Sequence, residues 1–115
     1  MIRKPTQRAP KHLKPATRRW VRQVLQTWVL EEHHRRLLVL AGEAWDRSTN
    51  ARTIIDQQGA VYFDRFGQPK IRPECLIERD AKATFARLLR ELDLDLEGPA
   101  ASSRPPALRS IKGGR

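Results

Sequence analysis

The chain has 115 residues, with 23 Lys and Arg against 13 Asp and Glu, and a formal net charge of +10. At this length we expect one domain, because a second core would lack apolar surface. One cysteine, Cys75, excludes an internal disulfide framework, and with three histidines it cannot form a Cys-rich zinc module. We also find no apolar run near the roughly 18 residues of a membrane span and no signal-peptide pattern. These features predict an intracellular protein that binds an anion, with nucleic acid the first candidate.

The positive charge is concentrated at the two ends. Residues 1–22 contain eight basic residues and no acidic one, and residues 98–115 contain four basic residues and no acidic one. Residues 23–97 contain 11 basic and 13 acidic residues, a net charge of −2. Proline recurs in both ends with few large apolar side chains, so neither end can offset its ordering entropy alone. We therefore predict a helical core and assembly domain over 15–97, a flexible basic arm over 1–14 and a flexible basic tail over 98–115.

The first expected helix begins at Pro15 and covers the segment ATRRWVRQVLQTWVL. Apolar residues recur in it at helical spacing: Trp20, Val21, Val24, Leu25 and Trp28. Proline suits the first helical position, whereas the preceding Lys14 has no short acceptor side chain and is a poor N-cap. Arg18, Arg19 and Arg22 fall on or beside the opposite face, so this helix is expected to present a basic surface.

The second expected helix is long, over residues 31–58, about 40 Å at 1.5 Å per residue. Its apolar-to-small stripe has spacings of three and four: Leu30, His34, Leu37, Leu38, Ala41, Ala44, Trp45, Ser48, Ala51 and Ile55. Leu40 and Ile54 lie off that stripe, so apolar surface extends around the cylinder. Glu31 and Glu32 suit the positive end of the helix dipole, and Gly59 is a natural stop.

A short hairpin or extended loop is expected next, because Val61, Tyr62 and Phe63 favour extended structure and DRFG is a plausible turn. A third helix is expected over about 73–94. Its apolar face consists of Leu76, Ile77, Ala81, Thr84, Phe85, Leu88, Leu89 and Leu92. Glu78 and Lys82 would form a supporting i,i+4 pair. The predicted fold class is mainly α, with three helices, one of them long and central, and a short β-hairpin-like insertion between the second and third.

Catalytic motifs are absent from the sequence. There is no phosphate-binding G-x-x-x-x-G-K-[ST] and no G-x-S-x-G, and Cys75 has no histidine near it in sequence. His33 and His34 are adjacent on a helix and point about 100° apart, which does not suit the usual i,i+4 chelation. The three tryptophans fall on apolar stripes, which favours packing over stacking on bases. We therefore expect no catalytic residue, no cofactor and no bound metal.

Five segments in order make the sequence resemble a known family: APKHLKPATRRWVRQV, WVLEEHHRRLLVLAGEAWDR, DRFGQPKIRPE, IERDAKATFARLLRELDLDLE and RPPALRS. From about Ala9 to Ser110 the chain closely resembles the small terminase subunit of tailed bacteriophages and prophages. The similarity is to the variety whose third helix ends in a short Leu-Asp-Leu segment. Relatives of this type commonly have a Ser or another capping residue at the position of Lys14.

The resemblance implies a function without catalysis of its own. Small terminase subunits form rings, recognise the packaging-initiation site on concatemeric viral DNA and deliver it to the large subunit, which has the ATPase and nuclease. The implied partners are double-stranded DNA, the large terminase subunit and further copies of this chain, in the cytoplasm of a bacterial host. A long helix with apolar surface beyond one face agrees with coverage by neighbouring subunits.

Candidate site residues follow from charge and position. The candidate DNA-binding residues are Arg3, Lys4, Arg8, Lys11, Lys14, Arg18, Arg19 and Arg22. The candidate oligomer interface consists of Leu37, Leu40, Ala44, Trp45, Ile54, Tyr62 and Phe63. The candidate docking residues for the large subunit are Arg104, Leu108, Arg109 and Lys112. Eight cations near phosphates predict salt-dependent binding with little base readout.

Two other function classes compete with this hypothesis. The first is a small DNA-binding regulator of phage or prophage origin that uses the first two helices as a helix-turn-helix, joined near Val29 and Leu30. Its weakness is that the second helix is too apolar for a recognition helix. The other class is a small metal-dependent nuclease using Glu31, Glu32 and His33, which lacks ligands from elsewhere in the chain.

Overall fold

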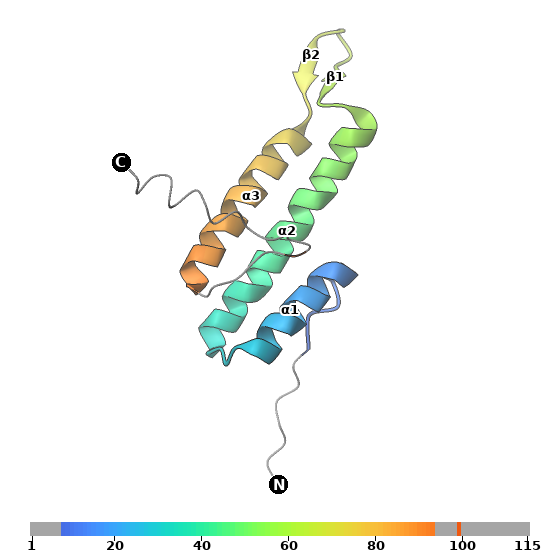
Figure 1. Cartoon of the computed structure of the whole chain (residues 1–115). Coiled ribbons are helices and arrows are strands. Elements are labelled where there is room, and N and C mark those ends of the chain that lie inside the picture. Colours follow the sequence, from blue (N-terminus) through green and yellow to red (C-terminus); the bar gives the residue numbers. More distant parts are fainter. Residues whose placement is uncertain (1–7, 94–98, 100–115) are drawn as a thin grey trace, which may run out of the picture.

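The computed structural model describes residues 8–93 and residue 99. In chain order the elements are α1 (Pro15–Thr27), α2 (Glu32–Gln58), β1 (Val61–Phe63), β2 (Pro69–Ile71) and α3 (Pro73–Leu92). Figure 1 shows α2 and α3 side by side, α1 beside the N-terminal half of α2, and the hairpin at the opposite end. The predicted fold class, three helices with a hairpin between the second and third, is confirmed. None of the described helices combines the length and apolar character needed to cross a membrane.

The long helix α2 begins and ends where its sequence predicts. Glu31 is its N-cap residue, and Glu32 in the first turn pairs with Arg36, with 3.1 Å between Oε2 and Nε. At the other end Gly59 adopts a φ of 88°, a conformation that costs glycine little, and its N–H donates to the carbonyl of Ile55. The predicted bounds are correct to within one residue.

The first helix is shorter than predicted. α1 starts at Pro15 as expected but ends at Thr27, and Trp28 follows as an extended C-cap residue whose N–H donates to the Val24 carbonyl. The placement of Trp28 on the helical apolar stripe is therefore wrong, and 36% of this residue is exposed. The chain needs the extended residues 28–31 to turn back and start α2, and this requirement overrides the apolar periodicity.

The core lies where all three helices meet, over the N-terminal half of α2. Its buried members are Leu13, Trp20, Val21, Val24, Leu25, Leu38, Ala41 and Leu92. Phe85 of α3 joins the three layers, since its ring centroid lies 5.9 Å from that of Trp20 and 5.0 Å from that of Trp45. Leu13 is 3% exposed, so the packed unit starts upstream of the predicted boundary at residue 15.

In the C-terminal half of α2 the described neighbours are α3 and, near Asp46 and Thr49, the turn before α1, and the hairpin extends beyond both long helices (Figure 1). Leu76 and Ile77 of α3, predicted on its core face, are 52% and 38% exposed as a result. The hairpin pairs Val61 with Ile71 and Phe63 with Pro69 in antiparallel register. All six strand residues are exposed.

The turn of the hairpin is stabilised by its own first residue. The carboxylate of Asp64 accepts hydrogen bonds from the backbone N–H groups of Phe66 and Gln68 at 2.8 and 3.0 Å. Gly67 has a φ of 79°, which suits glycine in a tight turn. The predicted turn at DRFG is thereby confirmed.

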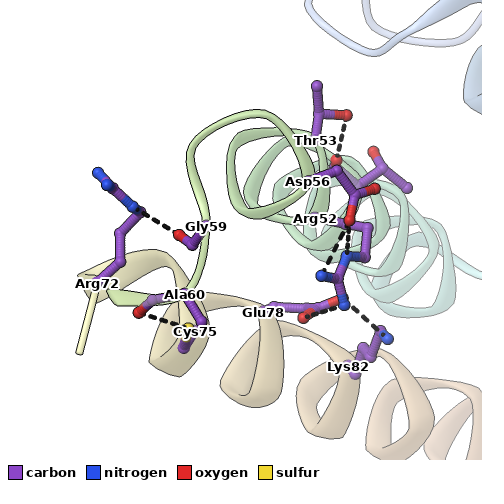
Figure 2. A network of polar contacts seen from close by, with 10 residues as sticks. Arg52, Thr53, Asp56, Gly59, Ala60, Arg72, Cys75, Glu78 and Lys82 are labelled. Carbon is purple, nitrogen blue, oxygen red and sulfur yellow. Dashed lines mark hydrogen bonds and ion pairs between the residues drawn. The ribbon is translucent and has the colours of Figure 1, made fainter. Parts of the chain in front are cut away.

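Polar contacts fix the base of the hairpin to the helix ends, as Figure 2 shows. Arg72 donates from Nε to the Gly59 carbonyl at 2.9 Å, and its backbone N–H donates to the Ala60 carbonyl at 2.7 Å. The thiol of Cys75, half-buried at the start of α3, lies 3.8 Å from the Ala60 carbonyl oxygen. Cys75 thus packs at the helix–hairpin junction.

A second set of contacts joins α2 to α3 near the same end (Figure 2). The predicted pair is present, since Lys82 Nζ lies 3.0 Å from Glu78 Oε2. Arg52 of α2 lies between two acids, 3.0 Å from Asp56 and 3.5 Å from Glu78. Because the side chain of Glu78 is 12% exposed, two cations neutralise a largely buried carboxylate.

Candidate nucleic-acid interface

An aspartate on α2 anchors the start of α1. Lys14 provides no side-chain cap, as its sequence predicts, and Asp46 accepts its backbone N–H at 2.8 Å instead. The other oxygen of the Asp46 carboxylate accepts the Thr17 hydroxyl at 2.6 Å. Asp46 is 8% exposed, so these charge-assisted bonds satisfy a nearly buried carboxylate. Gly42, one turn earlier on α2, allows this close approach, because a Cβ there would lie 3.1 Å from Thr17 Cγ2.

The turn before α1 is tied to the same stretch of α2. His12 Nε2 lies 2.7 Å from Glu43 Oε2, and the Lys14 ammonium donates to the Thr49 hydroxyl at 3.2 Å. Both contacts are exposed. Together with the Asp46 bonds, they fix the orientation of α1 on the core and therefore which of its faces meets solvent.

The two faces of α1 differ sharply. The inner face consists of the buried residues Thr17, Trp20, Val21, Val24 and Leu25. The outer face presents Arg19, Arg22, Gln23 and Gln26, all exposed, and α1 contains no acidic residue. Among the described residues, nothing forms a hydrogen bond or an ion pair with those four side chains. The outer face is therefore a cationic surface whose donors are available to a partner.

The predicted DNA-binding residues are placed unequally. Arg8, Lys11 and Lys14 are exposed on the upstream segment, and Arg19 and Arg22 are exposed on α1. Arg18 is half-buried at the edge of the inner face, and its Nε is shielded from solvent. Arg3 and Lys4 lie outside the described residues. The structure thus gathers five of the eight candidates as exposed cations on one helix and the segment leading into it.

Sequence reasoning missed two kinds of residue here. Gln23 and Gln26 share the outer face with the arginines, and the helical period that placed Arg19 and Arg22 there would have found them too. Asp46 was missed because it lies beside, not on, the apolar stripe of α2. The signal available for it was the poor cap at Lys14, which requires an acceptor from elsewhere in the chain.

An open groove of about 530 Å³ lies beside the upstream turn, lined by residues of that turn, α2 and the start of α3. Its polar lining consists of the acids Glu43, Asp46 and Glu74, with Arg47, His12 and Asn50. Glu43 and Asp46 are already engaged with the turn before α1 and with α1 itself. The groove therefore belongs to the junction that holds α1 in place.

The histidine pair lies closer to a ligand cluster than its spacing predicts. Glu31, His33 and His34 bring one ligand atom each within 4.8 Å of one another, and the two imidazole centroids are 4.1 Å apart. Glu31 and His33 are exposed, and the cluster lies at the positive end of the α2 dipole, which opposes a cation. Glu32, which the nuclease hypothesis requires, faces Arg36. We keep the prediction of no bound metal on these electrostatic grounds.

The hairpin end of the molecule has a cluster of exposed apolar side chains, which we call the apolar end. Its members are Val61, Tyr62, Phe63, Phe66, Ile71, Leu76 and Ile77, all between 38% and 75% exposed. Two of the rings have a guanidinium over them, from Arg72 above Tyr62 and from Arg65 above Phe66. An apolar surface of this extent is typical of an interaction site.

The predicted oligomer-interface residues divide into three groups. Leu40, Tyr62 and Phe63 are exposed, at 49%, 39% and 69%. Leu37, Trp45 and Ile54 are half-buried, with Leu37 against the core and Trp45 against Phe85. Ala44 is 2% exposed and is covered within the chain itself, so it leaves no surface for a neighbour.

No protein-family model, curated protein or solved structure matches the chain. The predicted docking residues for a large subunit, Arg104, Leu108, Arg109 and Lys112, lie outside the described residues. The described residues thus present two exposed surfaces: the cationic outer face of α1 and the apolar end.

Proposed function

We propose that this chain is a small terminase subunit, a DNA-packaging adaptor that binds viral DNA, self-associates into a ring and recruits the large terminase subunit. The observation that carries the proposal is the outer face of α1, where exposed arginines have no partner among the described residues. The resemblance of five ordered sequence segments to small terminase subunits supplies the biological role.

Binding to duplex DNA is supported by the way α1 is presented. Its 13 residues form a cylinder about 20 Å long, and an α-helix with its side chains fits the width of the major groove. Lys11 and Lys14 are exposed just before the N-terminal end of the helix and add positive charge there. The two nearby carboxylates are engaged within the chain, since Asp46 accepts bonds from Lys14 and Thr17 and Glu43 lies 2.7 Å from His12.

Self-association is supported by the apolar end and by Leu40 on α2. Phe63 and Phe66 are 69% and 75% exposed, and burying one such ring contributes about 1.5–3 kcal/mol. The hairpin that presents them is fixed by Arg72 and by the Asp64 turn, so little ordering cost opposes association. The interface we propose therefore centres on Phe63 and Tyr62, with Leu40, about 28 Å away along α2, as a separate contact, and it omits Ala44.

The DNA test compares two charge-matched double variants. Arg19→Ala/Arg22→Ala removes two cations from α1, and Arg87→Ala/Arg90→Ala removes two exposed cations from α3. Binding to a labelled duplex is measured by fluorescence anisotropy over a salt series. We expect the α1 variant alone to weaken binding and to reduce the slope of log K against log salt by up to about 1.8, at about 0.9 for each arginine that contacts a phosphate. Equal effects of the two variants would refute an α1 interface.

The assembly test uses Phe63→Ser/Phe66→Ser, which changes only exposed side chains and should leave the fold intact. Light scattering at micromolar concentration should show an oligomer for the unchanged chain and a smaller species for the variant. A monomeric unchanged chain would contradict the ring. Stimulation of a large terminase by the chain, measured as ATP hydrolysis on DNA, tests the packaging role itself.

The helix-turn-helix regulator has less support. A recognition helix needs an exposed polar face, whereas α2 has α1 and α3 packed against it (Figure 1). Its buried positions include Leu38, Ala41 and Ala51, spread along the helix. Operator-specific repression without any effect on a large terminase would favour this alternative.

A further inference from the structure

We infer that the outer face of α1 recognises DNA bases directly, with Gln23 and Gln26 as specificity-determining residues on the same strip as the guanine-binding arginines Arg19 and Arg22. This inference rests on the proposed DNA-binding function and extends it from charge to sequence recognition. It differs from the sequence-based expectation, in which eight cations bind phosphates with little base readout.

The spacing of the four residues places them on one narrow strip. Positions 19, 22, 23 and 26 follow the i, i+3, i+4, i+7 pattern, and at about 100° per residue they fall within an arc of about 100°. The residues Trp20, Val21 and Val24 are buried against α2 and α3, so the strip on the opposite side of the helix faces solvent. A helix presented this way can lie in the major groove without moving from its place on the core.

The chemistry of the strip matches base edges better than it matches a phosphate-binding surface alone. An arginine donates two hydrogen bonds to guanine O6 and N7, and a glutamine donates to N7 and accepts from the amino group of adenine. A neutral amide adds nothing to the long-range attraction of phosphates, so charge does not explain Gln23 and Gln26. Neither contributes to the fold, since both are exposed and form no hydrogen bond with any described residue.

The dimensions define a short recognition site. From residue 19 to residue 26 the helix rises about 10 Å, which corresponds to about three base pairs at 3.4 Å each. The adjacent cations Lys11, Lys14 and Arg8 lie upstream of the strip and suit the phosphate backbone that borders the groove. One chain is therefore expected to specify about three base pairs that include guanine and adenine, with the remaining affinity coming from phosphates.

The experiment is an enrichment of duplexes with a randomised centre, followed by anisotropy on the enriched sequence and on a scrambled duplex at one salt concentration. Four chains are compared: the unchanged protein, Gln23→Ala/Gln26→Ala, Arg19→Lys/Arg22→Lys and the control Gln57→Ala, an exposed glutamine at the end of α2. Circular dichroism confirms that each variant is folded, as expected for substitutions at exposed helical positions by good helix formers.

We expect the unchanged protein and the control to enrich one motif. The double glutamine variant should bind the scrambled duplex as before but lose at least about 5- to 150-fold of its preference for the enriched one, since each bidentate base contact contributes a factor in that range. The lysine variant keeps its charge and should also lose preference for the enriched duplex, because an ammonium group cannot donate the two parallel hydrogen bonds of a guanidinium.

Two outcomes would overturn base recognition while leaving DNA binding intact. In one, the unchanged protein binds duplexes but enriches no motif. In the other, the double glutamine variant enriches the same motif with the same preference. If the unchanged protein binds no duplex even at low salt, the proposed function fails together with this inference.

Discussion

Replacing Asp46 tests whether one carboxylate holds the DNA-binding helix on the core. Asp46→Ala removes the acceptor of two hydrogen bonds, from the Lys14 N–H at 2.8 Å and from the Thr17 hydroxyl at 2.6 Å. The Thr17 hydroxyl is buried, so in Asp46→Ala it would lose its acceptor without becoming fully hydrated. Bonds to a charged group contribute about 1.5–3 kcal/mol each, and water in the adjoining groove recovers part of this. We therefore expect a loss of about 3 kcal/mol.

Such a loss is large for a single domain, whose free energy of unfolding is usually about 5–15 kcal/mol. For a unit of this size it lowers the melting temperature by about 12–24 °C. The assay is urea unfolding followed by circular dichroism at one fixed protomer concentration, since self-association would also stabilise the fold. Asp56→Ala is the matched control, because Asp56 forms an exposed pair with Arg52 and its loss should cost about 0.3–0.5 kcal/mol.

A double-mutant cycle assigns the effect to the bond itself. Thr17→Val keeps the shape of the buried side chain and removes its hydroxyl, so it should cost about 1.5–3 kcal/mol in the unchanged protein and almost nothing beside Asp46→Ala. Amide hydrogen exchange should also speed up in α1 before it does in α2. If Asp46→Ala unfolds within about 0.5 kcal/mol of Asp56→Ala, the carboxylate does not anchor α1 and our account of its orientation fails.

Three further predictions concern packing and the tail. Gly42→Ala should destabilise the protein by about 1–2 kcal/mol despite the better helix propensity of alanine, because its Cβ would lie 3.1 Å from the hydrogen-bonded Thr17; urea unfolding that shows greater stability would contradict this. Phe85→Ala should cost about 2–3 kcal/mol and shift tryptophan emission to the red, since two indole rings lose a neighbour; an unchanged spectrum would argue against that cluster. Truncation after the buried Pro99 should abolish stimulation of a large terminase while duplex binding stays within about twofold, as measured by ATPase and anisotropy assays; retained stimulation would exclude residues 100–115 as the docking segment.

The starts of α1 and α3 and the end of α2 were predictable because local signals and tertiary structure agree there. Pro15 and Pro73 open α1 and α3, and Gly59 ends α2 at a positive φ that few other residues adopt. The turn at DRFG was predictable for a similar reason, since Asp64 and Gly67 satisfy its hydrogen bonds and dihedral angles locally. In each case the sequence signal is a residue at the boundary itself, and no distant contact is needed to explain it.

Features that depend on long-range contacts were not predictable from periodicity. Trp28 continues the apolar stripe of α1 yet leaves the helix, because the connection to α2 needs extended residues. Leu76 and Ile77 continue the stripe of α3 yet stay exposed, because no described element covers them. Apolar spacing identifies a face that avoids water but not which segment covers it. For the two α3 residues, we propose that a neighbouring subunit does so.

The two proposed surfaces lie at opposite ends of α2, and this separation is consistent with the proposed function. The outer face of α1 lies over the N-terminal half of this helix, and the apolar end lies beyond its C-terminus (Figure 1). Subunits joined through the apolar end would therefore keep every α1 free to meet DNA. A site of about three base pairs is too short for useful specificity in one chain. Linked copies bind further sites at high effective concentration, so weak recognition by each α1 can sum to selection of one packaging site.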